Sequence, residues 1–182
     1  MVTIVGRGGY SVLELLVGVL MIALIAAVGV PQLLRHIQRV QLEGAAHSLA
    51  SDMMRARYVG VVQNCRCRFR IDAGRGCYWW EEDRNLNRVL DPGEVLAPER
   101  TLPGGIRFDC TGVIGPPYAP TQPPPGPVTF PGSQLNAGPD GRWASPGAVY
   151  LANDWGDHAA VSVAISGRVR VWAWNEDVRR WE

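Results

Sequence analysis

The sequence contains no lysine, and its 18 basic residues, all arginine, are nearly balanced by 17 acidic residues. The resulting net charge of +1 excludes a chain that binds nucleic acid through its overall charge, so a charged partner has to recognise a local patch. Cysteine is scarce as well. Four cysteines in 182 residues are too few for a small domain that is held together mainly by disulfides.

Sequence motifs of common enzyme classes are also missing. The chain has no Gly-x-Ser-x-Gly, no phosphate-binding loop and no His-Glu-x-x-His, and His36, His47 and His158 have no partner at a catalytic spacing. We therefore expect that the protein is not an enzyme. Glycine and proline are abundant instead: 21 and 14 residues exclude an all-helical bundle and favour short strands joined by turns.

One long apolar segment lies near the N-terminus. Residues 15–34 carry no charge and consist almost wholly of aliphatic residues and glycine, which is enough for a membrane-spanning helix of about 20 residues. A short leader, residues 1–9, precedes the segment, and a single acid, Glu14, lies at its start. Because an unpaired carboxylate in a membrane helix costs free energy, Glu14 is a candidate functional residue.

The junction between the leader and the apolar segment resembles that of type IV prepilins. Gly9 is followed by an aromatic residue, Tyr10, and Glu14 takes the fifth place after the glycine. Pro31 adds to the resemblance, because pilin helices commonly carry a proline at this place. The resemblance implies that a prepilin peptidase cuts between Gly9 and Tyr10, that the new amine of Tyr10 is methylated, and that Glu14 takes part in docking to other pilin subunits.

The helix is expected to continue beyond the membrane. After Pro31, apolar or small residues recur at alternating intervals of four and three: Leu42, Ala46, Leu49, Met53, Ala56 and Gly60. We interpret this stripe as the face that packs on a globular head. Pro31 should kink the helix without necessarily ending it. We thus expect a transmembrane helix at residues 10–34 and an amphipathic helix at residues 35–64.

Residues 42–71 narrow the resemblance to the FimT/GspH group of minor pilins and pseudopilins. They contain an Ala-Ala pair, a leucine, an Ala-Arg pair and a polar break before a strand. The group implies an α+β fold, with a long N-terminal helix packed on a small β-sandwich. It also implies a structural subunit of a type II secretion pseudopilus or a type IV pilus, anchored once in the bacterial inner membrane, with its head in the periplasm or on a surface filament.

Residues 65–182 predict a β-rich head. Residues 65–71 alternate strictly, with cysteine, phenylalanine and isoleucine on the inward face, and a turn at 72–76 leads to a strand at 77–80. Further short strands are expected at 94–96, 106–108, 128–130, 148–151, 160–165 and 169–174. Eight of the 14 prolines fall within residues 115–131, which favours a stiff exposed loop; docking into an aromatic groove of a partner is the alternative.

The four cysteines are candidates for disulfides, because the head would lie in an oxidising compartment. They are Cys65, Cys67, Cys77 and Cys110, and three complete pairings remain open. Since Cys65 and Cys67 are two residues apart on one strand face, we expect each to reach another segment rather than the other. A zinc site is disfavoured because no Cys-x-x-Cys pair is present.

A metal site is the first candidate for binding chemistry. Residues 83–94 place oxygen ligands at the spacing of an EF-hand calcium loop: Asp83, Asn85, Asn87, the carbonyl of Val89, Asp91 and Glu94. Arg88 stands where the sharp bend of such a loop favours glycine, and no flanking helices are expected. A hairpin turn closed by its own Asp and Asn side chains is therefore favoured, and calcium is the alternative.

A nucleic-acid site is the second candidate. Arg168 and Arg170 share one face of the last long expected strand, and Trp172, Trp174 and Trp181 follow. Arginines can contact phosphates, and tryptophans can stack on bases. Residues 167–170 also resemble a Gly-Arg-x-Arg ending in FimT-like minor pilins of natural transformation, which implies DNA as a partner in uptake. The alternative is the solvated face of an edge strand.

Overall fold

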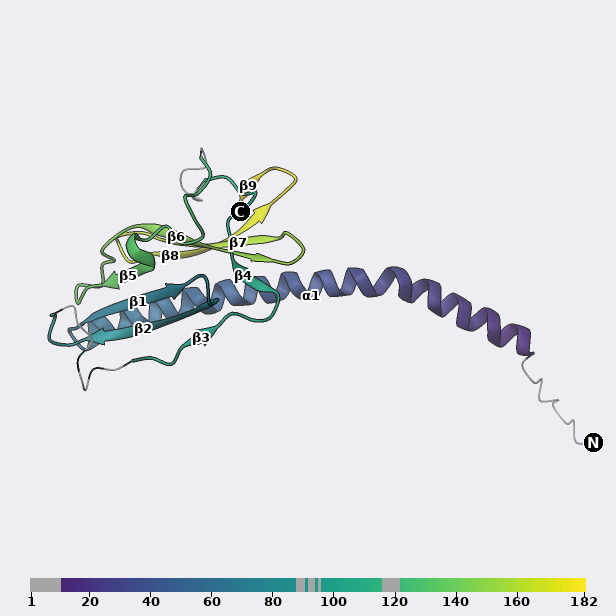
Figure 1. Cartoon of the computed structure of the whole chain (residues 1–182), viewed down its shortest axis with the longest axis horizontal. Coiled ribbons are helices and arrows are strands. Elements are labelled where there is room, and N and C mark those ends of the chain that lie inside the picture. The colour runs from purple at the N-terminus through teal and green to yellow at the C-terminus, as the bar shows by residue number, and fades with distance from the viewer. Residues whose placement is uncertain (1–10, 88–90, 92–93, 95, 116–121) are drawn as a thin grey trace, which may run out of the picture. The chain divides into compact units, whose positions relative to one another are not determined.

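The computed structural model of the chain describes residues 11–87, 91, 94, 96–115 and 122–182. Gly9, Tyr10 and Val89, to which the sequence analysis gives roles, lie outside these residues. By its internal contacts, the chain divides into two units, Met1–Ile37 and Gln38–Glu182. The division falls within a single long helix, α1 (Val12–Val62), which is labelled in Figure 1.

The helix α1 runs without a break through Pro31, in agreement with the expectation that the proline need not end it. Ser11 caps its first turn: the Glu14 N–H donates to Ser11 Oγ at 3.1 Å, and the Leu15 N–H donates to the Ser11 carbonyl at 3.2 Å. The helix carries one stretch that is long and apolar enough to cross a membrane, and no described residue of the chain covers that stretch.

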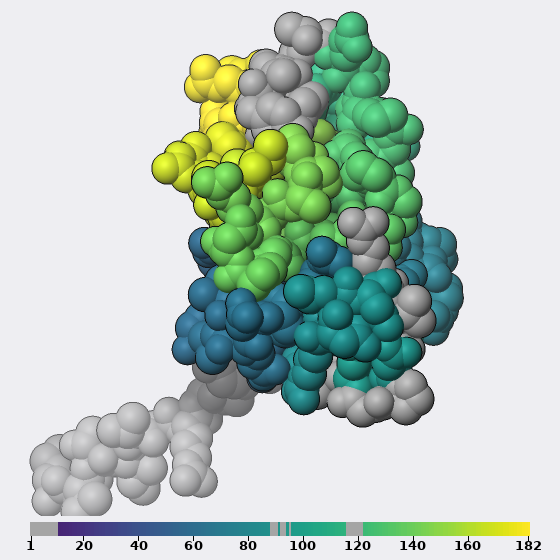
Figure 2. Space-filling view, turned by 90° about the vertical axis from the view of Figure 1, so that its left-hand side faces the viewer, coloured from purple at the N-terminus to yellow at the C-terminus, as the bar shows by residue number. Residues whose placement is uncertain are grey.

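The second unit contains two antiparallel sheets. The first sheet has the order β3-β2-β1-β5 and is formed by β1 (Arg66–Asp72), β2 (Cys77–Asp83), β3 (Arg100–Thr101) and β5 (Gln134–Ala137). The second has the order β4-β6-β7-β8-β9 and is formed by β4 (Ile106–Phe108), β6 (Gly147–Asn153), β7 (His158–Val163), β8 (Val169–Asn175) and β9 (Arg180–Trp181). One turn of 3-10 helix, η1 (Pro131–Ser133), precedes β5. In Figure 2, the blue to teal surface and the green to yellow surface occupy different parts of the head. The α+β pilin-like fold is thereby confirmed.

Some of the expected strands are wrong. Of the strand expected at 94–96, Glu94 and Leu96 belong to no named strand, Leu96 makes an isolated bridge to Glu81, and Val95 lies outside the described residues. Residues 128–130 form no named strand either, although Val128 bridges Val149 and the Pro127 carbonyl accepts the Tyr150 N–H at 2.8 Å. The end of the proline-rich segment therefore lies along β6 as an extended chain. Gln122, Pro123 and Pro125 are exposed, and residues 116–121 of the expected loop lie outside the described residues.

The main core lies between α1 and the inner faces of the two sheets. All six residues of the expected helix stripe are buried, and Ala46, Leu49, Met53 and Ala56 have no exposed surface. They pack with Phe69 of β1, Leu135 of β5 and Val161 of β7, among others. Burial of one such large apolar side chain contributes about 1.5–3 kcal/mol, so the stripe is a major source of the stability of the head.

A smaller core covers the outer face of the second sheet. Tyr150 and Trp181 pack there with Val113, Ala148, Ala160 and Trp174. The Tyr150 hydroxyl donates to the Gly115 carbonyl at 3.1 Å, and the Trp181 ring N–H donates to the Ile114 carbonyl at 3.0 Å. Because these bonds satisfy the polar atoms of both rings, the segment up to Gly115 and the C-terminal strand are held onto the sheet.

A matched pair of substitutions tests the helix-to-head packing. Met53 is fully buried, whereas its neighbour Met54 is 48% exposed. We expect Met53→Ala to lower the free energy of unfolding of the head by about 2–5 kcal/mol, because it leaves a cavity between helix and sheets. Met54→Ala, the same chemical change, should alter it by less than about 0.5 kcal/mol. All seven tryptophans lie in the head, so tryptophan fluorescence during urea denaturation of the full chain in detergent micelles measures both values. Equal destabilisation by the two variants would contradict the packing described here.

Candidate functional site

The N-terminal half of α1 presents apolar side chains on every side. Leu15, Leu20 and Ile25 are between 63% and 73% exposed, and further aliphatic residues up to Leu34 are similarly uncovered. Glu14 is the one acid of the first turn, and no charged residue follows it before Arg35. Among the described residues, no side chain donates to the Glu14 carboxylate. This half of the helix therefore has the composition of a membrane span with one ionisable group at its start.

The last turns of α1 are held to the head by Arg57. Its Nε–H donates to the Gly141 carbonyl at 2.6 Å, and its guanidinium lies against Gly167, where a Cβ atom would approach it to 2.6 Å. Gly167 has a φ of +94°, a conformation that other residues adopt only with strain. The glycine of the Gly-Arg-x-Arg segment is thus required by its turn and by the close approach of a helix arginine. The sequence contains no signal of this contact between residues so far apart.

A second polar connection joins α1 to the first sheet. The Tyr78 hydroxyl donates to Asp52 Oδ2 at 3.1 Å, and Arg100 Nε lies 3.2 Å from the same oxygen. Burial, together with the negative charge of Asp52, raises the pKa of Tyr78 well above its usual range, so the hydroxyl remains a donor at any physiological pH. Asp52 is a buried acid on the packing side of the helix, and the sequence analysis did not assign it a role.

Arg168 and Arg170 lie beside each other, as expected from their alternation along β8. Both are exposed, and they line a cavity of about 340 Å³ together with Ser162, Ile165 and Trp172, among others. The Arg170 guanidinium lies 5.7 Å from the centre of the Trp172 ring, and the Trp172 ring N–H donates to Ser162 Oγ at 2.8 Å. Within the described part of the chain, neither arginine has an ion-pair partner.

The other two tryptophans named as stacking candidates are placed differently. Trp174 and Trp181 are each 8% exposed and pack edge to face in the smaller core, with 5.1 Å between ring centres. They are not available to stack on bases, so that part of the expectation is wrong. Of the nearby arginines, Arg180 pairs with Glu182 at 3.1 Å. The candidate DNA contacts are thus reduced to Arg168, Arg170 and Trp172.

The position of β8 at a sheet edge is consistent with a DNA-binding surface and with the solvated face of an edge strand. The strand β9 pairs with β8 only at Trp174 and Asn175. In the described residues, Val169 to Trp172 therefore line an edge of the second sheet. Charged side chains at such an edge discourage pairing with other chains, and the same charges are accessible to a phosphate backbone.

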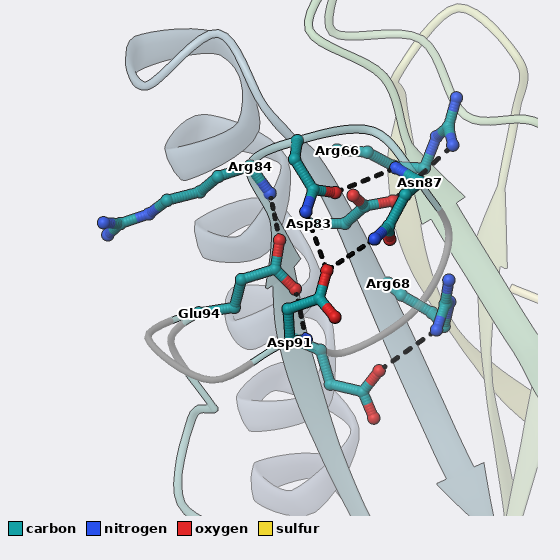
Figure 3. Close-up of polar contacts among 9 residues, drawn as sticks. Arg66, Arg68, Asp83, Arg84, Asn87, Asp91 and Glu94 are labelled. Carbon is teal, nitrogen blue, oxygen red and sulfur yellow. Dashed lines mark hydrogen bonds and ion pairs between the residues drawn. The ribbon is translucent and has the colours of Figure 1, made fainter.

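The candidate calcium loop is closed by its own hydrogen bonds (Figure 3). Asp91 Oδ2 accepts bonds from the side-chain amides of Asn85, at 2.7 Å, and Asn87, at 2.5 Å. The Glu94 carboxylate accepts the N–H groups of Arg84 at 2.8 Å and Asp91 at 2.9 Å. These backbone donors, with that of Asp91 first, lower the pKa of Glu94. The loop thus has the bonds of a plain Asx-rich turn.

Asp83, the first candidate ligand of the loop, has a different surrounding. It is 3% exposed, and its Oδ2 lies 3.6 Å from Arg66 Nη1. Asn85, Asn87, Asp91 and Glu94 gather around one another, whereas Asp83 faces an arginine of β1 (Figure 3). The described residues contain no group of three or more His, Cys, Asp or Glu side chains arranged to hold a metal ion.

The cysteines are free thiols in the structure. The thiols of Cys65 and Cys67 lie close enough to interact with each other, whereas the sequence analysis expected each to reach another segment. Burial raises the pKa of both, and that of Cys67 most, so neither is a reactive thiolate. Cys77 is buried beside Glu99, and Cys110 packs against the smaller core. Cys65 and Cys67 are thus the pair that the fold brings together.

Comparison with known proteins identifies the fold. No family model and no curated protein matches the sequence. Among solved structures, the chain is similar to two structures of the minor pseudopilin EpsH from the type II secretion system of Vibrio cholerae, each with a TM-score of 0.51. Sequence identity is 15% and 14%; the similarity covers 75% and 74% of this chain and 99% and 94% of those chains. The chain thus has the fold of a minor pseudopilin.

The response to calcium tests the loop at residues 83–94. Because Asp91 and Glu94 are already satisfied by protein donors, we expect the melting temperature of the full chain in detergent micelles to be the same with a chelator and with millimolar calcium. Asp91→Ala should lower the melting temperature equally in both buffers, because it removes the acceptor of two amides. A calcium-dependent rise in the wild-type protein, lost in Asp91→Ala, would show a metal site instead, since a ligand that binds only the folded state stabilises it.

Proposed function

We propose that this protein is a structural subunit, a minor pseudopilin or minor pilin, that assembles into an inner-membrane filament through the N-terminal half of α1. The observation that supports this most is the division of one continuous helix. Its C-terminal half is buried in the head, whereas its N-terminal half is apolar on every side and uncovered by any described residue. An apolar helix of this length is stable only in a bilayer or among other apolar helices.

The leader fits the same function. A prepilin peptidase that cuts between Gly9 and Tyr10 would remove Arg7 and the rest of the polar leader and leave a free amine four residues before Glu14. A carboxylate within a membrane is strongly favoured to pair with a positive group. The Glu14 carboxylate of one subunit and the N-terminal amine of the next provide such a pair, so docking and charge neutralisation occur together.

A filament role also explains why the head is joined so firmly to the helix. Arg57 and Asp52 tie α1 to the two sheets by hydrogen bonds and ion pairs, in addition to the apolar stripe. A load transmitted along the helix therefore reaches the whole head. The similarity to EpsH, a minor pseudopilin of a type II secretion system, supports a pseudopilus; the same fold and helix would serve a type IV pilus equally well.

Substitution of Glu14 tests the assembly step. We expect Glu14→Ala to enter the membrane and be processed normally but to be lost from filaments, because the buried amine loses its charge partner at a cost of about 3–5 kcal/mol. Glu43→Ala is the matched control: this acid of α1 is exposed and pairs only with Arg39, at 3.5 Å. Immunoblots of membranes and of sheared or cross-linked filaments measure both variants. Normal incorporation of Glu14→Ala would refute the docking role.

A second candidate function is DNA binding within an uptake filament. The specific observation in its favour is that Arg168 and Arg170 are exposed, have no ion-pair partner among the described residues, and flank Trp172 at a cavity. Most other exposed arginines of the head, such as Arg142 and Arg180, are paired with an acid. Two free guanidinium groups beside one aromatic ring suit weak, sequence-tolerant contact with phosphates and a base.

The salt dependence of DNA binding tests this second function. With two to four phosphate contacts, the affinity of the full chain in neutral detergent micelles for a duplex should fall with a log-log salt slope of about −2 to −4. Arg168→Gln with Arg170→Gln should reduce the slope by about two units, because two counterion-releasing contacts are lost. Arg142→Gln with Arg180→Gln removes the same charge and should leave the slope unchanged. Absence of any binding at low salt, where electrostatic attraction is strongest, would exclude the uptake function.

A further inference from the structure

The strand β1 carries a row of three arginines that the proposed function does not use. Residues Cys67, Phe69 and Ile71 point into the main core, so the alternate residues Arg66, Arg68 and Arg70 lie on the opposite face of the first sheet. The antiparallel register places Glu81 of β2 and Asn136 of β5 on either side of Arg68, and Gln134 beside Arg70. This outer face is therefore polar across three strands.

The arginine row lines a cavity of about 660 Å³. Its lining consists of three guanidinium groups, two amides and one small residue: Arg66, Arg68, Arg70, Gln134, Asn136 and Ala144. Among the described residues, none that lines the cavity is acidic. The arginine side chains are recessed, with 26%, 10% and 40% of their surface exposed. A recessed group of positive charges attracts anions more strongly than exposed arginines do, because water screens it less.

The acids behind the row only partly satisfy the guanidinium groups. Glu81 is shared: its two oxygens lie 3.3 Å from Arg68 Nη1 and 2.9 Å from Arg70 Nε. The ring N–H of Trp79 donates to the same carboxylate at 3.1 Å. Asp83 lies 3.6 Å from Arg66, beyond a good hydrogen-bond distance. Among the described residues, Arg68 and Arg70 thus share one carboxylate and Arg66 lies 3.6 Å from another, so the guanidinium groups that line the open side of the cavity can bind a further acceptor.

Three buried polar atoms of this site also lack a well-aligned partner. They are Arg66 Nη1 and Arg70 Nε, which are donors, and Asn136 Oδ1, which is an acceptor. Buried polar atoms in folded proteins are nearly always hydrogen-bonded. A molecule that completes this site must therefore offer both acceptors to the arginines and a donor to Asn136.

We propose that this cavity binds an acidic peptide segment of a partner protein. A glutamate or aspartate side chain supplies the planar carboxylate that a guanidinium fork binds best, and the backbone N–H of the same segment supplies the donor for Asn136. The phosphates of DNA offer acceptors only, and the recessed floor of the cavity is poorly placed for the backbone of a duplex. This surface is separate from the helix that assembles the filament, so the proposal does not depend on the assembly function.

Binding of a simple acidic peptide to the full chain tests the proposal. The probe is the capped, fluorescently labelled hexapeptide Gly-Glu-Glu-Glu-Glu-Gly, measured by anisotropy with the protein in neutral detergent micelles, against the same peptide with glutamine in place of glutamate. We expect binding of the acidic peptide only. Arg66→Gln with Arg70→Gln should weaken it about tenfold, whereas the matched pair Arg142→Gln with Arg180→Gln should leave it unchanged.

Asn136→Ala separates a peptide from a small anion. It should weaken binding of the acidic peptide about threefold to tenfold and leave competition by inorganic phosphate unchanged, because phosphate does not donate to Asn136. Tryptophan fluorescence shows whether the double arginine variant folds. If it does not, Asn136→Ala and the comparison of the glutamate and glutamine peptides still test whether the cavity binds an acidic peptide. The proposal is overturned if both peptides bind equally, if Asn136→Ala has no effect on the acidic peptide, or if the arginine row binds a DNA duplex and not the peptide.

Discussion

The structure depends on the burial of one stripe of α1 between two sheets. Leu42, Leu49 and Met53 pack in the main core with residues from the inner faces of the first and second sheets. Without the stripe, each sheet would expose an apolar face to water, at a cost that the short strands could not offset. The head is therefore a domain only in combination with the C-terminal half of the helix, whereas the N-terminal half carries exposed apolar side chains. The proposed membrane anchoring and assembly use this second half.

The outer faces of the two sheets can carry side chains that bind partners, because the inner faces supply the apolar residues of the core. On the second sheet, β8 presents Arg168 and Arg170 beside Trp172, while its inward residues Val169 and Val171 pack against the core. On the first sheet, alternate residues of β1 form the core and the arginine row. In both places the alternation of a strand separates stability from binding, so substitutions on the outer face can change partners without loss of the fold. The hydrogen bonds of Arg57 and Asp52 are different, since they hold the helix to the head. Substitution of either residue would therefore affect the fold.

Periodic features of the molecule could be predicted from the sequence, and features set by distant contacts could not. The stripe of α1 and the strands β1 and β8 have clear periods, because in each of them one face packs against the core. The strands β6 and β7 are instead short, largely apolar runs that are buried on both faces. The strands β3, β5 and β9 are only two to four residues long. They form because they pair with neighbouring strands, so no local sequence pattern predicts them. Leu96 and Val128 lie in segments whose composition favours strands, but each forms only an isolated β-bridge.

The site residues follow the same rule. Glu14, Arg168 and Arg170 could be named as candidates from the sequence because their motif or alternation is local. The contact of Arg57 with Gly167 and the bond of Asp52 to Tyr78 join segments far apart in the sequence, and only the fold shows them. The pairing of Cys65 with Cys67 was missed for a different reason: Cys65 precedes the first residue of β1 and follows Asn64, which has a φ of 52°, so the regular spacing of strand side chains does not yet apply.

The mass of the mature chain tests most directly whether this helix belongs to a processed filament subunit. The protein would be isolated from the membranes of cells that contain the cognate prepilin peptidase, and its intact mass and N-terminal peptide would be determined by mass spectrometry. The account predicts a chain that begins at Tyr10, carries one methyl group on its N-terminal amine and retains all of α1. A chain that still carries residues 1–9, or one that is cut after the apolar segment as a secretory signal would be, would contradict it.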